Sequence, residues 1–118
     1  MIDKRLLGTW KSDLRRTARE ARERHLVPED KIKKLKCCFG KLRLRFTRTR
    51  IYSDFKGEKS VEPYRVVAKD AYSVAILAPG LINKEEEEIA HIHFEGNYYW
   101  VWPDIARFPE YFKRVDPS

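Results

Sequence analysis

The chain has 118 residues and carries 25 Lys and Arg against 18 Asp and Glu, so its formal net charge is +7. This length suits one small domain, residues 1–118, and a hydrophobic content of 42% is enough to build a core. No apolar run approaches the length of a membrane-spanning helix, and the first residues lack the apolar core of a signal peptide. We therefore expect a folded, basic, cytoplasmic protein.

The positive charge is concentrated in the first part of the chain. Residues 1–50 contain 17 Lys and Arg and 6 Asp and Glu, whereas residues 51–118 contain 8 and 12. A helical segment with a solvated basic surface explains this asymmetry without any partner. The functional alternative is a face that binds anions.

A short strand and two short helices are predicted first. Apolar alternation indicates the strand over residues 6–11. Ser12 or Asp13 then offers an N-cap for a helix that continues to about Arg24, and the thin apolar stripe of this helix places it at the surface. Pro28 suits the first turn of the second short helix.

From Lys41 onward the apolar residues recur with a period of two. Leu42, Leu44 and Phe46 alternate with basic residues, which predicts a half-buried strand with a charged outer face. Turn residues divide the remainder into further strands over residues 49–56, 61–68, 72–78, 86–95, 98–103 and 110–115. Short strands joined by tight turns predict a mainly β fold: a small antiparallel meander barrel of about eight strands, with two short helices after the first strand.

The strongest local signal is a hairpin around Gly96 and Asn97. Gly at the first position of a two-residue turn fits a type II′ turn. The resulting register gives three facing pairs, Glu95–Tyr98, His93–Trp100 and His91–Trp102. One face of the hairpin carries all six of these side chains, while the other face is apolar enough to be the core by itself.

Two His and two Trp residues together are unusual for a purely solvated face. Small-molecule sites combine apolar aromatic area with a few polar groups that fix the orientation of the ligand. We therefore predict a site for a small apolar or aromatic ligand formed by His91, His93, Tyr98, Trp100 and Trp102. Alternation does not determine whether this face lies inside or outside the barrel.

The same face suggests an alternative, a metal-dependent enzyme. His91 and His93 point the same way and Glu95 lies beside them, but a catalytic metal also needs an open coordination position, and nothing in the spacing demands a metal. The chain also lacks a nucleophile elbow and a glycine-rich phosphate loop. We expect a binding protein rather than an enzyme, with no metal and no cofactor.

The basic residues support another alternative, an interaction module that docks an anionic partner through its basic helical face. The candidate anion-binding residues are Arg15, Arg19, Arg22, Arg43 and Arg45. Proteins that bind single-stranded nucleic acid intersperse aromatic residues among basic ones, so that bases can stack. Here the Trp and Tyr cluster lies in the acidic half, which disfavours nucleic acid.

The two ends of the chain resemble a known superfamily. Residues 7–11 contain a G-x-W motif, and residues 111–115 of the last predicted strand carry the basic residue Arg114. Together they resemble the calycins, which include lipocalins and fatty-acid-binding proteins. The order of strand, two short helices and meander is more similar to the fatty-acid-binding proteins. The resemblance implies a ligand-binding barrel closed at one end by Trp10 packed against Arg114. The C-terminal Arg-x-Tyr pair that binds carboxylates in that group is missing, because Tyr111 precedes Arg114.

Overall fold

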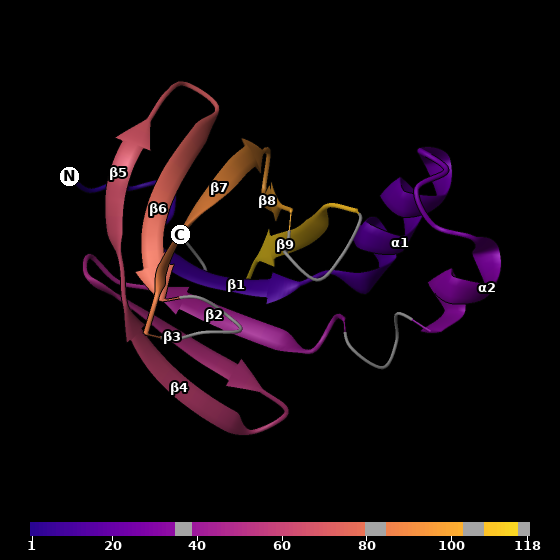
Figure 1. Cartoon of the computed structure of the whole chain (residues 1–118), viewed down its shortest axis with the longest axis horizontal. Helices are drawn as coiled ribbons and strands as arrows, with labels where there is room; N and C mark the ends of the chain where they lie inside the picture. The colour runs from indigo at the N-terminus through magenta and orange to yellow at the C-terminus, as the bar shows by residue number, and fades with distance from the viewer. Residues whose placement is uncertain (35–38, 80–84, 103–107, 116–118) are drawn as a thin grey trace.

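The structure is a computed structural model that describes residues 1–34, 39–79, 85–102 and 108–115. In these ranges it contains two α-helices and nine β-strands (Figure 1). Their bounds in chain order are β1 Gly8–Ser12, α1 Leu14–Glu23, α2 Glu29–Ile32, β2 Leu42–Phe46, β3 Arg50–Phe55, β4 Glu58–Pro63, β5 Arg65–Lys69, β6 Ser73–Pro79, β7 Glu87–Glu95, β8 Tyr98–Val101 and β9 Glu110–Arg114. None of the helices described is long or apolar enough to span a membrane.

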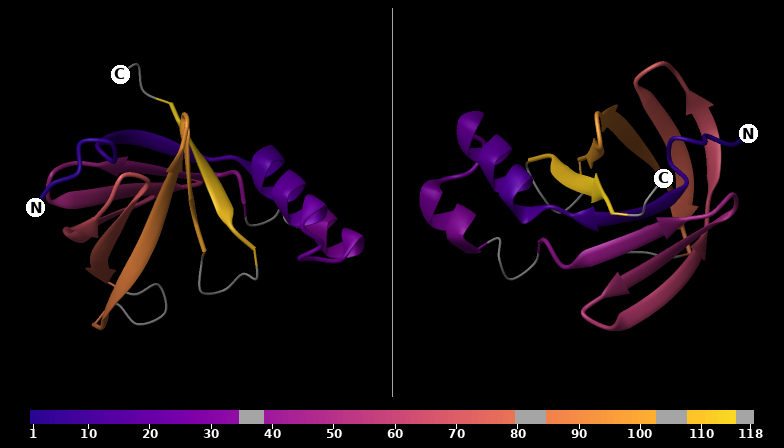
Figure 2. Two further views of the ribbon diagram at one scale, coloured as in Figure 1. Left: turned by 90° about the horizontal axis from the view of Figure 1, so that it is seen from above. Right: turned by 180° about the vertical axis from the view of Figure 1, so that it is seen from behind.

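All nine strands belong to one antiparallel sheet, with the order β4-β3-β2-β1-β9-β8-β7-β6-β5. The sheet curls until β4 contacts β6, which produces a nearly closed barrel (Figure 2). Its two edges, β4 and β5, are consecutive in the chain, whereas the first and last strands pair with each other in the middle of the sheet. The predicted fold class, a mainly β barrel with two short helices, is confirmed.

One strand predicted from the sequence, over residues 61–68, is divided in two by Tyr64. The N–H of Tyr64 donates to the carbonyl of Thr49 at 3.0 Å, and its buried ring meets Phe46 edge-on with the ring centroids 5.5 Å apart. At Tyr64 the chain leaves β4, which pairs with β3, and enters β5, which pairs with β6. Alternation does not reveal the break, because apolar residues continue on both sides of it.

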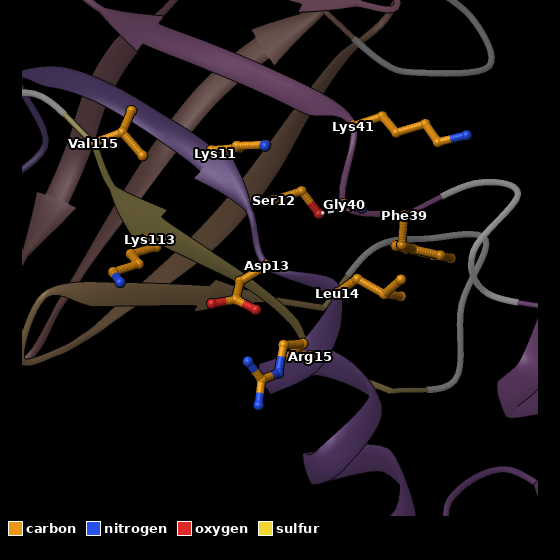
Figure 3. A pocket seen from close by; sticks show the side chains of 10 residues that line it. All are labelled: Lys11, Ser12, Asp13, Leu14, Arg15, Phe39, Gly40, Lys41, Lys113 and Val115. Carbon is orange, nitrogen blue, oxygen red and sulfur yellow. Dashed lines mark hydrogen bonds between the residues drawn. The ribbon is translucent and has the colours of Figure 1, made fainter.

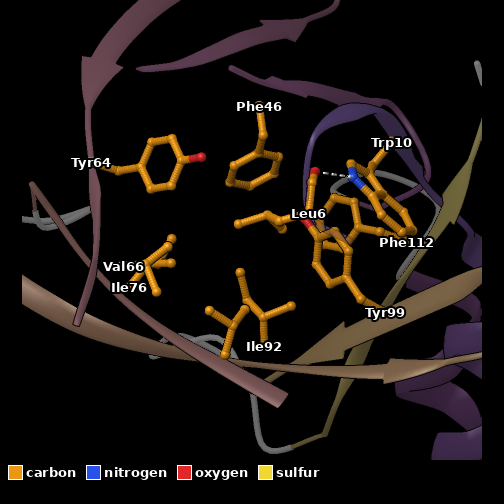
Figure 4. Close-up of a cluster of buried hydrophobic side chains, with 10 residues drawn as sticks. Leu6, Trp10, Phe46, Tyr64, Val66, Ile76, Ile92, Tyr99 and Phe112 are labelled. Atoms are coloured by element: carbon orange, nitrogen blue, oxygen red, sulfur yellow. Dashed lines mark hydrogen bonds between the residues drawn. The ribbon is translucent and has the colours of Figure 1, made fainter. Parts of the chain in front are cut away.

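Aromatic and aliphatic side chains fill the interior at one end of the barrel, which we call the closed end (Figure 4). The rings of Trp10 and Tyr99 are almost fully buried and lie 4.8 Å apart, and Tyr99 stacks on Phe112. The indole N–H of Trp10 donates to the carbonyl of Leu6 at 2.9 Å. Full burial of one such side chain contributes roughly 1.5–3 kcal/mol, so this cluster is a major source of stability.

The two helices lie at the end of β1, beside the start of β9 (Figures 1 and 2). Asp13, one of the two residues predicted as N-cap, accepts a hydrogen bond from the N–H of Arg16 at 3.0 Å. Buried Thr17 accepts a hydrogen bond from the N–H of Tyr111, which fixes α1 to β9. A second small core beside the barrel contains Ala21, Ile32 and Phe108.

Candidate functional site

The β7–β8 hairpin places its His- and Trp-bearing face on the outside of the barrel. Ile92 and Tyr99, which alternate with His93 and Trp100 along the strands, are buried in the core. The predicted ligand-binding residues therefore lie on the outer surface and do not line the interior: His91, His93, Tyr98, Trp100 and Trp102. Both faces of this hairpin carry aromatic residues, so their pattern alone could not separate inside from outside.

The turn between β7 and β8 has the predicted geometry at its first residue. Gly96 has a φ of 61°, as a type II′ turn requires. Two of the three predicted facing pairs are present, Glu95–Tyr98 and His93–Trp100. The pairing of His91 with Trp102 was wrong, because β8 ends at Val101 and the two strands separate.

A hollow of about 450 Å³ lies where β7 and β8 separate. Its outward-facing lining residues are Ile89, His91, His93, Trp100 and Trp102, and its inward-facing ones are Ala78, Glu88, Ala90 and Val101. Four of the five predicted ligand-binding residues thus share one hollow. Tyr98 is separate from it and packs beneath the guanidinium of Arg16, 5.0 Å from its ring centroid.

His93 and Trp100 form a flat wall of this hollow. Their rings stack with centroids 4.0 Å apart and an interplanar angle of 14°. Burial, and then the nearby His91, lower the pKa of His93, which favours the neutral imidazole. A neutral imidazole on an indole presents an apolar surface, while the exposed His91 supplies a polar group at the rim.

Glu95 does not join His91 and His93 in a metal site. Its Oε1 accepts a hydrogen bond from Nη2 of Arg16 at 2.7 Å, which directs the carboxylate towards α1. Within the ranges that the structure describes, no three His, Cys, Asp or Glu side chains are grouped so that they could hold a metal ion. The geometry therefore does not assemble the metal site considered from the sequence.

Trp10 and Arg114 are cross-strand partners at the closed end. The guanidinium carbon of Arg114 lies 4.2 Å from the centroid of the Trp10 ring. Nη1 of Arg114 donates to the carbonyl of Leu7 at 2.8 Å, and Nη2 donates to the carbonyl of Arg5. This is the contact implied by the resemblance of the chain ends, and it ties the last strand to the segment that precedes the first.

The opposite end of the barrel, which we call the mouth, is filled less tightly. Four apolar side chains face inward there and are only partly buried: Leu42, Ala78, Ala90 and Val101. Inner-face apolar side chains at the mouth thus stay partly exposed, whereas the closed end is a packed core.

A buried carboxyl group, that of Glu110, also lies at the mouth. The side chain is 9% exposed, and its Oε2 accepts a hydrogen bond from the Ser12 hydroxyl at 2.8 Å. Burial raises the pKa of Glu110 to about 7, although the bond from Ser12 opposes the shift. This residue was not predicted from the sequence. The sequence pattern that indicates its position is its alternation with Phe112 and Arg114, which places all three side chains on the inner face.

The arginines predicted to bind anions do not form one surface. Arg22 pairs with Glu29 through Nη2 and Oε1 at 2.8 Å, and the guanidinium of Arg45 lies over the ring of Tyr52. The remaining three, Arg15, Arg19 and Arg43, are exposed. Of these three, Arg15 and Arg43 belong to the group of cations described next, whereas Arg22 and Arg45 are engaged in the contacts above.

A denser group of cations lies on the outer face of the sheet. Lys11 is directly opposite Lys113 on β9 and Arg43 on β2. Beside them, a surface hollow of about 560 Å³ is bordered by Arg15, Lys41 and apolar residues such as Leu14 and Phe39 (Figure 3). We call the group the basic sheet face: Lys11, Arg15, Lys41, Arg43 and Lys113.

Comparison with known proteins concerns the fold. No family model matches the chain, and no curated protein sequence matches it significantly. A solved structure described as "As-p18, an extracellular fatty acid binding protein" superposes with a TM-score of 0.55 at 10% sequence identity, covering 98% of this chain and 99% of that chain. The chain thus shares the β-barrel fold of that structure, which is the kind of fold that the resemblance of its two ends implied.

Proposed function

We propose that this protein binds a small apolar or aromatic ligand in its β-barrel. The observation that carries the proposal is the mouth, where Leu42, Ala90 and Val101 face inward yet stay partly exposed. Covering such surface contributes about 25 cal/mol for each Å² of apolar area removed from water. The fold shared with a fatty acid binding protein supports the proposal.

The charges at the mouth favour an uncharged or cationic ligand over a carboxylate. In the described strands, the ionisable side chains on the inner face at this end are carboxyl groups, Glu58, Glu88 and Glu110. The inward-facing Arg114 lies at the closed end, where it donates to backbone carbonyls. A ligand carboxylate would therefore meet like charge at the mouth, whereas a hydroxyl or amine would find acceptors.

Tryptophan fluorescence tests this proposal, because the tryptophans report on two places. Trp10 is buried inside the barrel, and Trp100 and Trp102 line the outer hollow. In a Trp100→Phe/Trp102→Phe variant the emission comes from Trp10 alone. We expect saturable changes in that emission on titration with dodecanol and dodecylamine, and a weaker response to dodecanoate. No saturable change with these three compounds or with a hydrophobic dye would refute a ligand-binding barrel.

A second function is favoured by the basic sheet face. Like charges directly opposite each other on neighbouring strands are destabilising, and Lys11 faces two cations. In the described part of the chain, neither Lys11 nor its two neighbours Lys113 and Arg43 forms an ion pair. An anionic partner docked on the sheet would relieve this repulsion. We infer that such a partner binds the sheet rather than the basic side of α1, where Arg22 is already paired.

Salt-dependent binding to a fluorescein-labelled oligonucleotide or acidic peptide separates the two faces. The sheet variant Lys11→Glu/Lys113→Glu is expected to lose affinity, and the helix variant Arg19→Glu/Arg22→Glu to retain it. The reverse result would assign docking to α1. Anisotropy that does not rise with the concentration of either probe would remove this second function.

A further inference from the structure

The wall of the barrel is split between β7 and β8. Strand β7 has nine residues, but β8 pairs only with residues 93–95, and the last pair is His93 with Trp100. On its other side, β7 pairs with β6 as far as Glu87. Residues 87–92 thus have a neighbouring strand on one side only, among the residues described, and the two strands diverge from their common turn (Figure 2). We call this opening the β7–β8 split.

The hollow at the β7–β8 split reaches both faces of the wall. Its lining includes Ala90 and Val101, which pack against the inner core, as well as Trp102 on the outside. At 450 Å³ it falls within the range of roughly 300–1,000 Å³ that is usual for small-molecule sites. The inner side carries small residues, Ala78 and Ala90, where larger side chains would fill the passage. The hollow is therefore bordered both by outer-face residues and by inner-face residues at the mouth.

The outer rim of the split is apolar. Ile89 is 60% exposed and Trp102 is 49% exposed, and both line the hollow. These two side chains present apolar surface to water at the edge of the same hollow. An apolar molecule arriving from water would lose hydration at these two side chains before it reached the interior.

We propose that the apolar ligand of the barrel enters and leaves laterally, through the β7–β8 split. This inference rests on the proposed function, because only a barrel that holds a ligand needs an entrance. Passage between fully paired strands would break backbone hydrogen bonds, each worth roughly 0.5–1.5 kcal/mol in net stability. Among the described residues, no β7–β8 ladder pairs residues 87–92, so the barrier there is set by exposed side chains such as Trp102.

The edges β4 and β5 offer the competing route, since they are also unpaired with each other. There the buried ring of Tyr64 packs against Phe46, and its hydroxyl donates to the carbonyl of Thr47. The chain itself crosses from one edge to the other at Tyr64. We call the junction of these two edges the β4–β5 seam. A buried aromatic residue fixes this seam, whereas the β7–β8 split is bordered by exposed side chains and a hollow.

Stopped-flow kinetics with N-dodecyl dansylamide, an uncharged fluorescent probe, tests the route. Ile89→Trp narrows the rim and Trp102→Ala widens it, and both positions are exposed enough to leave the fold intact. We expect Ile89→Trp to slow association and dissociation by the same factor, roughly threefold or more, and Trp102→Ala to speed both, as for other gated sites. The equilibrium Kd should stay unchanged, because an entrance alters the barrier and not the bound state. The matched control is Val67→Trp on β5, at an exposed position away from the hollow.

The possible outcomes distinguish failure of the lateral route from failure of ligand binding itself. Wild-type rates in both rim variants, with Kd intact, would overturn the lateral route and leave the ligand-binding barrel standing. Altered rates in Val67→Trp alone would move the entrance to the β4–β5 seam. A changed Kd with an unchanged association rate would make the hollow the binding site itself and overturn its role as an entrance. Failure of the wild-type protein to bind the probe would overturn the proposed function, and the entrance with it.

Discussion

His93 and Trp100 lie directly opposite each other on β7 and β8, with their rings stacked 4.0 Å apart, and they are the last pair before the two strands separate. The stack therefore closes one end of the β7–β8 split. It also explains how a four-residue strand stays on the sheet at this position, since aromatic cross-strand pairs stabilise a sheet by about 0.2–1 kcal/mol beyond Ala pairs.

Removal of the stack should weaken the hairpin. We expect His93→Ala to lower the free energy of unfolding by about 1 kcal/mol, because it removes the ring contact with Trp100. The control is His91→Ala at an exposed position on the same strand, with an expected effect below about 0.5 kcal/mol. Urea unfolding followed by far-UV circular dichroism measures both. Equal losses in the two variants would show that the stack carries no stability of its own.

The buried carboxyl of Glu110 should make stability fall as the pH rises. Its pKa is about 7 in the folded protein against an ordinary 4.5, so between these values the folded chain keeps a proton that the unfolded chain releases. The contribution is complete below about pH 4.5 and is lost as the pH approaches 7, to a total of up to about 3 kcal/mol. Urea unfolding at pH 5 and pH 7.5 measures this loss.

Glu110→Gln keeps the shape and the capacity for a hydrogen bond but cannot ionise. We expect its stability to fall less between the two pH values than that of the wild-type protein. The exposed Glu58→Gln serves as control and should retain the wild-type dependence. A wild-type slope in Glu110→Gln would assign the pH dependence to other groups.

Gly40 should tolerate alanine less well than Gly57. Both have a strongly positive φ, +88° and +90°, so alanine carries a similar conformational cost of about 1–2 kcal/mol at either site. A Cβ on Gly40 would also lie 2.9 Å from the Cβ of Leu14, whereas nothing lies within 4 Å at Gly57. The extra loss of stability in Gly40→Ala, measured by thermal unfolding, reports the packing of the chain against α1. Identical losses would mean that Leu14 moves aside at no cost.

Arg114 should matter far more than its neighbour Lys113. Arg114→Met removes two hydrogen bonds to backbone carbonyls and the contact with Trp10, so we expect a loss of about 2–4 kcal/mol. Lys113→Met on the exposed outer face should change stability by less than about 0.5 kcal/mol. In the Trp100→Phe/Trp102→Phe background, the red shift and quenching of Trp10 emission under denaturant would report the opening of the closed end. If the two variants had the same free energy of unfolding, Arg114 would not stabilise the closed end.

Most of the strands could be predicted because one face of each is buried. In β2 the alternation of Leu42, Leu44 and Phe46 with arginines follows directly from an apolar interior and a solvated exterior. The break at Tyr64 could not be predicted, because it depends on contacts with Thr49 and Phe46 that are distant in the sequence.

The candidate site was only partly predictable. The turn at Gly96 correctly placed His93 opposite Trp100, since a two-residue turn determines the register. The orientation of that face depends on which side packs better against Trp10 and Phe112, a property of the assembled core. Alternation places Glu110 on the inner face of β9, but its contact with Ser12 joins residues 98 positions apart and could not be predicted.

The nine strands can be viewed as a ring in which each strand pairs with its neighbours in sequence. The exception is β4 and β5, which are joined at Tyr64 but do not pair with each other. The pairing of β1 with β9 closes the ring. Two runs of local hairpins, β1–β4 and β5–β9, are thus joined across the middle of the sheet by contacts such as Trp10 with Arg114, separated by more than a hundred positions. Closing a loop over that distance costs more chain entropy than closing a local hairpin, so we expect this pairing to form after the hairpins on either side of it.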